Sequence, residues 1–379
     1  MSDNVIVFEY LDVNTTAIQT MEGIIIIDTQ RSPGIMLKIK NLIEKEFERD
    51  DFLYVINTHC HWDHSSGNQI FTESTIVAHE NCSSYMVNNP ANSIFNMVGI
   101  RQKILKLRNE FDNAASKSES KTKLEKMIVC WELVLDDFEN EYIITPPSLT
   151  FIDTSTISLE KLNIKLIYCG EAHTNNHIFI SIPGKNLLFT GDMFSSAVNP
   201  GFPINKLVNI PKVLKAIDKV LQSSNENLVV IPGHGELLTS NDLQNLRDII
   251  QERFESFGNK KSQVKMLEQM ISKFGLKAGI QKYDELTDEP QNEYYLLEEE
   301  FTVLGNRYIA EGKINEAICV FELGLKAFPG SVISLENIGR ALVVNGKIES
   351  AISYFEQSLK IFPNNEPTKY LLKYLVNKY

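Results

Sequence analysis

The sequence concentrates histidine in one short segment, residues 57–68 (NTHCHWDHSSGN). Three of the chain's seven histidines lie here with one aspartate, as His59, His61, Asp63 and His64. Neutral imidazole and carboxylate groups are the ligands that zinc and similar divalent metals prefer. In an extended segment His59 and His61 point to the same side and can bind one ion, while a following helical turn would direct Asp63 and His64 toward a second ion. The segment therefore predicts metal binding.

Three more polar segments with histidine or aspartate follow predicted strands: EAHTNNH (171–177), TGD (190–192) and PGHG (232–235). Strand ends expose their side chains at one rim of a β scaffold, so we expect the four segments to converge. Together they offer five imidazoles and two carboxylates, from His59, His61, Asp63, His64, His173, Asp192 and His234. Seven ligands are too many for one tetrahedral ion, but they suit two ions that share a carboxylate and a water.

Apolar runs of strand length must position these segments. The predicted strands cover residues 5–10, 23–29, 52–57, 74–79, 149–153, 156–159, 164–169, 177–182, 187–190 and 228–232. The strands at 177–182 and 187–190 are expected to form a hairpin about Pro183-Gly184. Amphipathic helices are predicted at 32–45 and 210–222. Residues 81–146 have helical periodicity and predict a helical hairpin inserted into the β framework. Beyond about residue 240 the sequence predicts helices and no strands.

A repeat occurs near the end of the chain, where GKINEAICVFELGLKAFPG (312–330) returns as GKIESAISYFEQSLKIFPN (346–364). A period of 34 residues with small residue, alanine, aromatic and closing proline in this order resembles the tetratricopeptide repeat. Gly305 and Gly339 fit the position where the two helices of one repeat cross closely. We therefore expect an all-α module of two repeats, at about 298–331 and 332–365, followed by a C-terminal helix.

The motifs GIIIIDT, THCHWDH, AHT, TGD and PGHG stand in this order before residue 240, and together they resemble the metallo-β-lactamase superfamily. The resemblance implies an α/β fold, an αββα sandwich with the metals at one rim of its two sheets. The domains expected are a catalytic domain (1–255, helical insertion about 81–146), a helical connector (256–297) and the tetratricopeptide repeats (298–379).

The resemblance also implies how the ligands divide between two ions, which would be Zn²⁺, with Fe or Mn possible. The first ion would bind His59, His61 and His173, the second Asp63, His64 and His234, and Asp192 would bridge them. This set resembles the version without cysteine found in glyoxalase II-like and subclass B3-like hydrolases. Lactamases that use a cysteine ligand differ, since no cysteine is near Asp192 or His234 in the sequence.

Several neighbouring residues have more than one interpretation. Asp28, which ends GIIIID, either orients a metal ligand or forms the turn at the strand end. His177 either contacts the metal site from outside, donates a proton to a leaving group, or caps the strand that it begins; the family often has Gly-Asp or Gly-His where this chain has Asn175 and Asn176. For His79 no metal role is expected, and Cys60 and Trp62 are expected to face away from the metals into the core.

The resemblance implies a zinc-dependent hydrolase, in which a hydroxide that bridges the metals attacks a lactam, lactone, thioester or related ester. Asp63 and Asp192 are the candidate catalytic residues, because as ligands they could also orient the nucleophile or carry a proton. Two alternatives stay open: a mononuclear-iron enzyme similar to persulfide dioxygenases, and a protein-binding scaffold with vestigial catalysis. The insertion is the expected selector of the substrate, which the sequence does not identify.

Composition excludes several classes of partner. The formal net charge of −12 disfavours nucleic acid and anionic membranes, whose phosphates are bound by lysine and arginine. No apolar run reaches the ~20 residues of a membrane span, and no secretory signal is visible. Five scattered cysteines without CxxC spacing indicate a reducing, cytoplasmic compartment. The expected partners are a small-molecule substrate and, through the repeats, a second copy of the chain or another protein.

Overall fold

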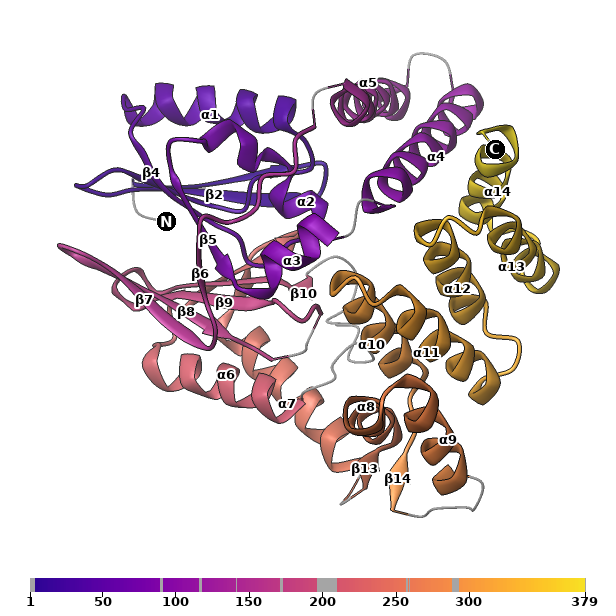
Figure 1. Cartoon of the computed structure of the whole chain (residues 1–379). Coiled ribbons are helices and arrows are strands. Elements are labelled where there is room, and N and C mark those ends of the chain that lie inside the picture. Colours follow the sequence, from indigo (N-terminus) through magenta and orange to yellow (C-terminus); the bar gives the residue numbers. More distant parts are fainter. Residues whose placement is uncertain are drawn as a thin grey trace. The chain divides into compact units, whose positions relative to one another are not determined.

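In the computed structural model of the chain, the first sheet contains six strands in the order β1-β2-β3-β4-β5-β6 (Figure 1). They are β1 (Val5–Tyr10), β2 (Val13–Gln19), β3 (Ile24–Ile27), β4 (Phe52–Ile56), β5 (Thr75–His79) and β6 (Leu149–Phe151). β1, β2 and β3 pair antiparallel, whereas β3 to β6 pair in parallel. Helix α1 (Pro33–Phe47) makes the crossover from β3 to β4 that parallel pairing requires. All four isoleucines of β3 are buried, as in a strand covered on both faces.

The second sheet also contains six strands, in the order β12-β11-β10-β9-β8-β7. They are β7 (Thr154–Leu159), β8 (Leu162–Tyr168), β9 (Ile178–Ile182), β10 (Leu187–Ser195), β11 (Val229–His234) and β12 (Leu238–Thr239). The hairpin predicted at Pro183-Gly184 is present, with β9 and β10 antiparallel about the 3-10 turn Pro183–Lys185. Only the β10–β11 pair is parallel among the described strands of this sheet, and α6 (Ile210–Ser223) lies between the two in sequence.

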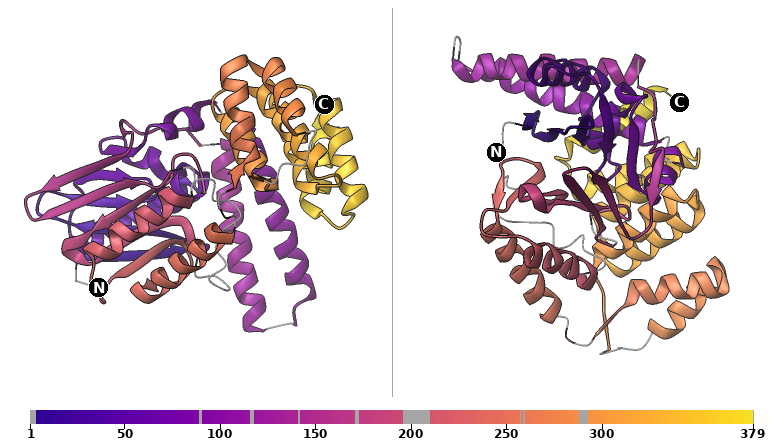
Figure 2. Two further views of the ribbon diagram at one scale, coloured as in Figure 1. Left: turned by 90° about the horizontal axis from the view of Figure 1, so that it is seen from below. Right: turned by 90° about the vertical axis from the view of Figure 1, so that its left-hand side faces the viewer.

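The two sheets pack face to face through an apolar core that includes Ile27, Ile56, Ile180 and Phe189. Figures 1 and 2 show α1 on the outer side of the first sheet and α6 on the outer side of the second. The αββα sandwich expected from the sequence is therefore present. Helix α1 begins where Ser32 caps it, since the Ser32 hydroxyl accepts a hydrogen bond from the Ile35 amide at 3.3 Å.

The described residues of the insertion form three helices, α3 (Asn81–Asn88), α4 (Ala91–Asn113) and α5 (Glu119–Asn140). The expected hairpin corresponds to α4 and α5, which run side by side (Figure 2), and α3 is an additional helix before it. Trp131, Val134 and Phe138 of α5 pack on the same core as α1. The insertion is therefore docked on the sandwich through α5.

Strand β2 was not expected, because its sequence VNTTAIQ has neither alternation nor an apolar run. Asn14, Thr15 and Thr16 are nevertheless buried. The Asn14 amide donates hydrogen bonds to the carbonyl oxygens of Pro232 at 2.9 Å and Gly235 at 2.8 Å. The Asn14 side chain of β2 thus holds the end of β11, which carries His234.

The structure describes residues 4–88, 91–115, 118–140, 142–170, 173–195, 210–256, 258, 260–287 and 293–378. The chain divides into two compact units, one of Met1–Phe202 with Pro211–Arg247 and one of Pro203–Ile210 with Asp248–Tyr379. Parts of the predicted EAHTNNH segment (171–172), of the connector (257, 259, 288–292) and of the C-terminal helix (379) lie outside the described residues. None of the described helices is long and apolar enough to cross a membrane.

The second unit is a large helical region. After α7 (Ser240–Ser256), which begins in the first unit, its helices are α8 (Gln263–Phe274), α9 (Leu276–Thr287), α10 (Glu298–Ala310), α11 (Ile314–Ala327), α12 (Val332–Val344), α13 (Ile348–Ile361) and α14 (Glu366–Lys378). The expectation of no strands here is wrong, because β13 (Lys261–Ser262) pairs with β14 (Tyr294–Tyr295). Pairing over two residues leaves no periodicity that a sequence pattern could reveal.

The helices of the predicted repeats cross at glycine. A Cβ atom at Gly305 of α10 would overlap the ring of Phe321 in α11, and a Cβ at Gly339 of α12 would lie 2.7 Å from the ring of Phe355 in α13. Both phenylalanine side chains are buried. The same close crossing therefore occurs twice at the predicted spacing.

Candidate metal centre

The histidine segment leaves β4 and changes conformation after His61. His61 has extended backbone angles and precedes the short helix α2 (Trp62–Ser65), so Asp63 and His64 lie on a helical turn. A Cβ atom at Gly67 would overlap the carbonyl oxygen of Thr29, so only glycine lets the chain pass this close to the end of β3. The extended and helical parts thus present their side chains in different directions, as the sequence predicts.

The other three ligand candidates come from the second sheet. His173 follows β8, Asp192 lies within β10 and His234 ends β11. β10 continues to Ser195, beyond the predicted end at residue 190, with an irregular register around Gly191. Gly191 has a φ of 49°, a left-handed conformation that glycine adopts without strain. This break places the Asp192 side chain at the rim of the sandwich.

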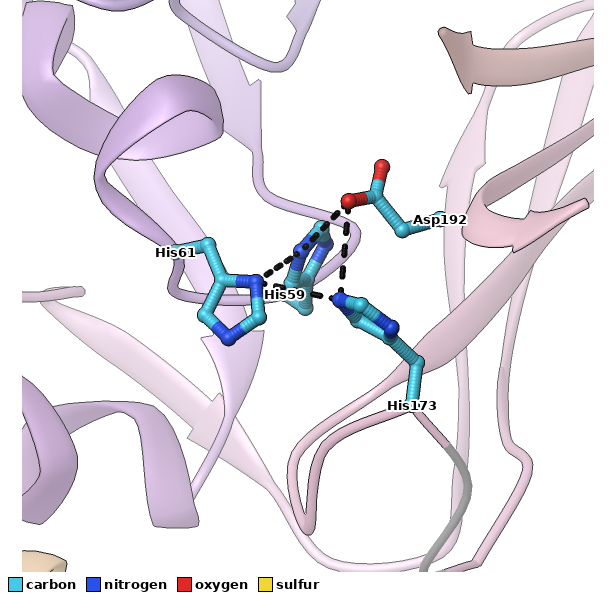
Figure 3. A group of neighbouring side chains, drawn as sticks. All are labelled: His59, His61, His173 and Asp192. Carbon is cyan, nitrogen blue, oxygen red and sulfur yellow. Dashed lines mark hydrogen bonds and ion pairs between the residues drawn. The ribbon is translucent and has the colours of Figure 1, made fainter. Parts of the chain in front are cut away.

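One group of possible metal ligands comprises His59, His61, His173 and Asp192, whose ligand atoms lie within 4.8 Å of one another (Figure 3). His61 Nδ1 is 3.1 Å from His59 Nε2 and 3.1 Å from His173 Nε2. The Oδ2 atom of Asp192 is 3.7 Å from His59 Nε2 and 3.5 Å from His173 Nε2. Three imidazoles and a carboxylate converge here from both sheets.

A second group comprises Asp63, His64, His234 and again Asp192. The other oxygen of Asp192, Oδ1, is 3.0 Å from His64 Nε2 and 3.3 Å from His234 Nε2. The Oδ2 atom of Asp63 is 3.4 Å from His234 Nε2 and 3.8 Å from His64 Nε2. Asp192 therefore faces both groups, one oxygen to each, so the structure brings all seven predicted ligand residues together.

Hydrogen bonds on the far side of two rings determine which nitrogen faces the centre. His234 Nδ1 is 2.7 Å from the carbonyl oxygen of Asp12, and His64 Nδ1 is 3.0 Å from Asp28 Oδ2. Because both partners only accept, each Nδ1 carries the proton, and a neutral ring then has a lone pair on Nε2. The two Nε2 atoms are 3.3 Å apart. Two nitrogens that face each other at this distance repel unless a proton or a metal ion lies between them, so this arrangement fits a positive charge there.

The Asp28 carboxylate also directs His59, through Thr58. The Thr58 hydroxyl donates to Asp28 Oδ2 at 2.8 Å, so its oxygen accepts from His59 Nδ1 at 3.1 Å. The Thr58 amide donates to the other oxygen of Asp28 at 2.8 Å. The buried Asp28, with a φ of 58°, thus contacts ligand residues of both groups directly or through one hydroxyl. This geometry favours the orienting role over that of a turn former.

The electrostatics of the centre also favour positive charge. Burial lowers the pKa of His64, but the charges of Asp192, Asp63 and Asp28 outweigh it and hold that pKa well above its usual value. At His234 burial is likewise outweighed, by hydrogen bonds to Asp192 and Asp63, which raise its pKa to about 9. Burial would raise the pKa of Asp63 and Asp192, yet the neighbouring histidines hold both below the usual range. Two ionised carboxylates therefore stabilise protons or a divalent cation here.

His177 lies behind His59 and belongs to neither ligand group. Its ring stacks on that of His59, with centroids 4.9 Å apart and 23° between the planes. Its Nε2 donates to the carbonyl oxygen of Thr190 at 2.7 Å, and burial lowers its pKa to about 4. A neutral, fully buried ring in this position contacts a ligand, which favours the first of the three interpretations over proton donation.

The segment AHTNNH has Asn176 where the family often has aspartate or histidine, and the structure gives this asparagine a role that the sequence did not predict. Its side-chain oxygen accepts from the Cys60 amide at 3.1 Å and so fixes the backbone between His59 and His61. Cys60 itself points into a small core with Cys82, and Trp62 packs beside Phe138, as expected.

Other supporting residues were also missed. Thr58, Asp12 and Asn14 gave no signal, because Asp12 acts through its backbone carbonyl and the other two through contacts with segments distant in sequence. His79, for which no metal role is expected, bonds to the carbonyl oxygen of Ile152 at 2.7 Å.

Comparison with known proteins gives one family. Residues 9–234, which include all seven ligand positions, match the model of the metallo-beta-lactamase superfamily. A "Metallo-beta-lactamase type 2" of Bacteroides fragilis is 26% identical over 122 residues, which are 32% of this chain and 48% of that protein. The chain thus spans about half the length of that relative.

Solved structures with a similar fold include the metallo-beta-lactamase from Pontibacter korlensis, with 16% identity, a TM-score of 0.43, and 66% of this chain and 96% of that chain covered. FIM-1 from Pseudomonas aeruginosa, in the mono-zinc form, has 14% identity, a TM-score of 0.43, and coverage of 67% and 93%. With identity and TM-scores this low, the family assignment rests on the sequence match.

Proposed function

The chain belongs to the metallo-β-lactamase superfamily, and we propose that it is a dinuclear metal-dependent hydrolase of a carbonyl-type substrate. A lactam, a lactone, a thioester or a related ester has the required electrophilic carbon. The observation that carries the proposal is the pair of ligand groups that share Asp192. The facing Nε2 atoms of His64 and His234 add that a cation suits the space between them.

The residues that would hold the ions follow from the two groups. One ion would bind His59, His61 and His173, the other Asp63, His64 and His234, with Asp192 between them. Imidazole and carboxylate ligands favour Zn²⁺, and Fe or Mn are compatible with them. When bound, the ions would polarise the substrate oxygen and lower the pKa of a water to near neutrality.

The two aspartates of the centre contribute through their charge. Their pKa values lie below the usual range, so both carboxylates are ionised at neutral pH. An ionised carboxylate accepts hydrogen bonds from the attacking water and orients it toward the substrate carbon. Asp63 and Asp192 are therefore the catalytic candidates, as ligands that also orient the nucleophile.

Elemental analysis and a substrate panel test this proposal. Purified full-length protein should contain two zinc ions per chain and hydrolyse at least one of nitrocefin, a lactone or a thioester, whereas hydrolysis of a phosphodiester alone would contradict a carbonyl-type substrate. Replacing His173 or Asp192 by alanine should abolish that hydrolysis while circular dichroism still shows the helical unit folded. One iron per chain, with oxygen consumed in the presence of a persulfide, would instead identify an oxygenase.

We propose that the chain divides into a catalytic domain of residues 1–255, a helical connector of 256–297 and tetratricopeptide repeats in 298–379. The repeats would mediate self-assembly. The support is the glycine–phenylalanine crossing that recurs in α10–α11 and α12–α13. Deleting residues 298–379 should reduce the apparent mass on a sizing column by more than the deleted segment accounts for. An unchanged oligomeric state would contradict assembly through the repeats and favour binding of another protein.

All five cysteines are free thiols. This state suits the cytoplasmic location that we propose for the protein. Fractionation of cells that express the full chain would test it, and recovery from the culture medium or the periplasm would contradict it.

A further inference from the structure

Arg31 lies beside the second ligand group, in the connection between β3 and α1. Its Nη1 atom is 3.4 Å from Asp63 Oδ2, and the two side chains are 11% and 13% exposed. The same oxygen of Asp63 faces His234 Nε2 at 3.4 Å. Arg31 therefore contacts the carboxylate oxygen that points at the centre of this group, although it is not itself a possible metal ligand.

Two indole rings hold the Arg31 guanidinium. Its Cζ atom lies 5.4 Å from the ring centroid of Trp62 and 5.2 Å from that of Trp131. These are the only tryptophans of the chain. A planar, weakly hydrated guanidinium suits such stacking, and cation–π attraction strengthens where water is excluded. The Nε atom also donates to the carbonyl oxygen of Leu11 at 3.2 Å, so the group is fixed from several sides.

The two tryptophans come from different parts of the chain. Trp62 belongs to the histidine segment, whereas Trp131 belongs to α5 of the insertion. The insertion is fixed here by Asp137, whose carboxylate accepts from the Gly34 amide at the start of α1 at 3.0 Å. Phe138 adds an edge-to-face contact with Trp62, with centroids 5.4 Å apart. Helix α5 thus contacts the loop of Arg31 and one of its flanking rings.

We propose that Arg31 is a positioning residue for the second metal subsite, and that the insertion acts on this subsite by holding Arg31 in place. The guanidinium keeps the Asp63 carboxylate in the orientation that directs Oδ2 toward His64 and His234. This inference rests on the proposed function, because it presupposes two bound ions. The guanidinium lies near two indole rings and its side chain is only 11% exposed, so Arg31 is better placed to orient Asp63 than to bind a substrate.

The test is a stepwise Zn²⁺ titration of the full-length protein against a chromophoric chelator. Hydrogen-bond partners of metal ligands contribute roughly 10–100-fold to metal affinity. Arg31→Met should therefore lower the affinity for the second ion by about this factor. The affinity for the first ion, bound by His59, His61 and His173, should not change. Arg31→Lys should not restore the affinity, because lysine keeps the charge but neither stacks nor presents a planar fork.

A matched control is Arg108→Met, which removes an exposed ion pair within the insertion. In this pair Arg108 Nη2 lies 2.5 Å from Glu132 Oε1. This variant should bind both ions as the wild type does. If Arg31→Met fails to fold, Trp131→Leu tests the same proposal. It removes one of the two rings beside Arg31 and should also lower only the affinity for the second ion.

Tryptophan fluorescence gives an independent readout, because both indoles contact Arg31. Emission of the wild type should change with the second equivalent of Zn²⁺, and in Arg31→Met this change should require a Zn²⁺ concentration about 10–100-fold higher. Two ions bound by the variants with wild-type affinities would overturn the role of Arg31 and leave the proposed function intact. A wild type that binds fewer than two ions would overturn both.

Discussion

Asp28→Asn is the most informative single change at the centre, because it alters no ligand and little volume. The carboxylate accepts three hydrogen bonds, from His64 Nδ1 and from the amide and hydroxyl of Thr58. Asparagine also tolerates the left-handed backbone at this position. If its amide oxygen keeps the bond to the Thr58 amide, its NH₂ group faces His64 Nδ1 and the Thr58 hydroxyl and donates to both.

The consequence is a reversal of two imidazole tautomers. His64 Nδ1 becomes an acceptor, so its proton moves to Nε2, which faces Asp192 and His234. The Thr58 hydroxyl, now an acceptor, donates to His59 Nδ1, and the proton of His59 moves to Nε2 as well. Each subsite then presents an N–H group where a lone pair is needed. Loss of an outer hydrogen-bond partner costs roughly 10–100-fold in metal affinity, about 1.4–2.7 kcal/mol for each ion.

The same chelator competition measures both affinities, and ¹⁵N chemical shifts of the histidine side chains report the tautomers directly. Thr58→Val is the matched control, since it removes only the hydroxyl beside His59 and should weaken the first ion alone. Melting curves followed by circular dichroism establish that both variants are folded. Wild-type affinity for both ions in Asp28→Asn would refute the reasoning that hydrogen bonds outside the centre set its lone pairs.

Two further changes test packing and charge outside the centre. Gly305→Ala should destabilise the α10–α11 pair by about 1–3 kcal/mol, because the added methyl group overlaps Phe321. Gly99→Ala, where the added methyl group meets open space, should instead stabilise helix α4 by about 1 kcal/mol. Hydrogen exchange of each helix measures both effects, and equal effects would contradict the close crossing at Gly305. Burial lowers the pKa of His79 below its usual value, so its neutral form, which accepts from the Asn81 amide, stabilises the fold above about pH 6.5, and this contribution is lost as the pH falls below that value. Between pH 7 and 5, denaturant titrations should therefore show a smaller loss of stability in His79→Gln than in the wild type, and equal losses would refute this role.

The residues that form the two candidate ligand groups could be identified from the sequence because their evidence is local. His59, His61, Asp63 and His64 lie within six positions, and each remaining ligand stands in a short polar segment near the end of an apolar run. Burial on both faces made β3 and β9 equally clear. The αββα fold follows from such runs and from the resemblance, and the structure and the family match agree with it.

The supporting contacts could not be predicted, for physical reasons that differ. Asp12 acts through its backbone carbonyl, which every residue type possesses. Asn14 lies in a strand whose polar residues are buried by partners more than 200 residues away. Arg31 depends on Trp131, whose distance in sequence hides their contact. Roles that depend on contacts between residues distant in sequence therefore become apparent only from the three-dimensional structure.

The division of the ligands between the sheets has a consequence for folding. Four candidates follow β4 of the first sheet, and three lie in or after strands of the second. If ions bind as proposed, each one is a reversible cross-link between the two halves of the sandwich, comparable to a disulfide that a chelator can open. At a free metal concentration a hundred times Kd, one such link stabilises the native state by about 2.7 kcal/mol. The folded fraction of this protein would then follow the supply of metal.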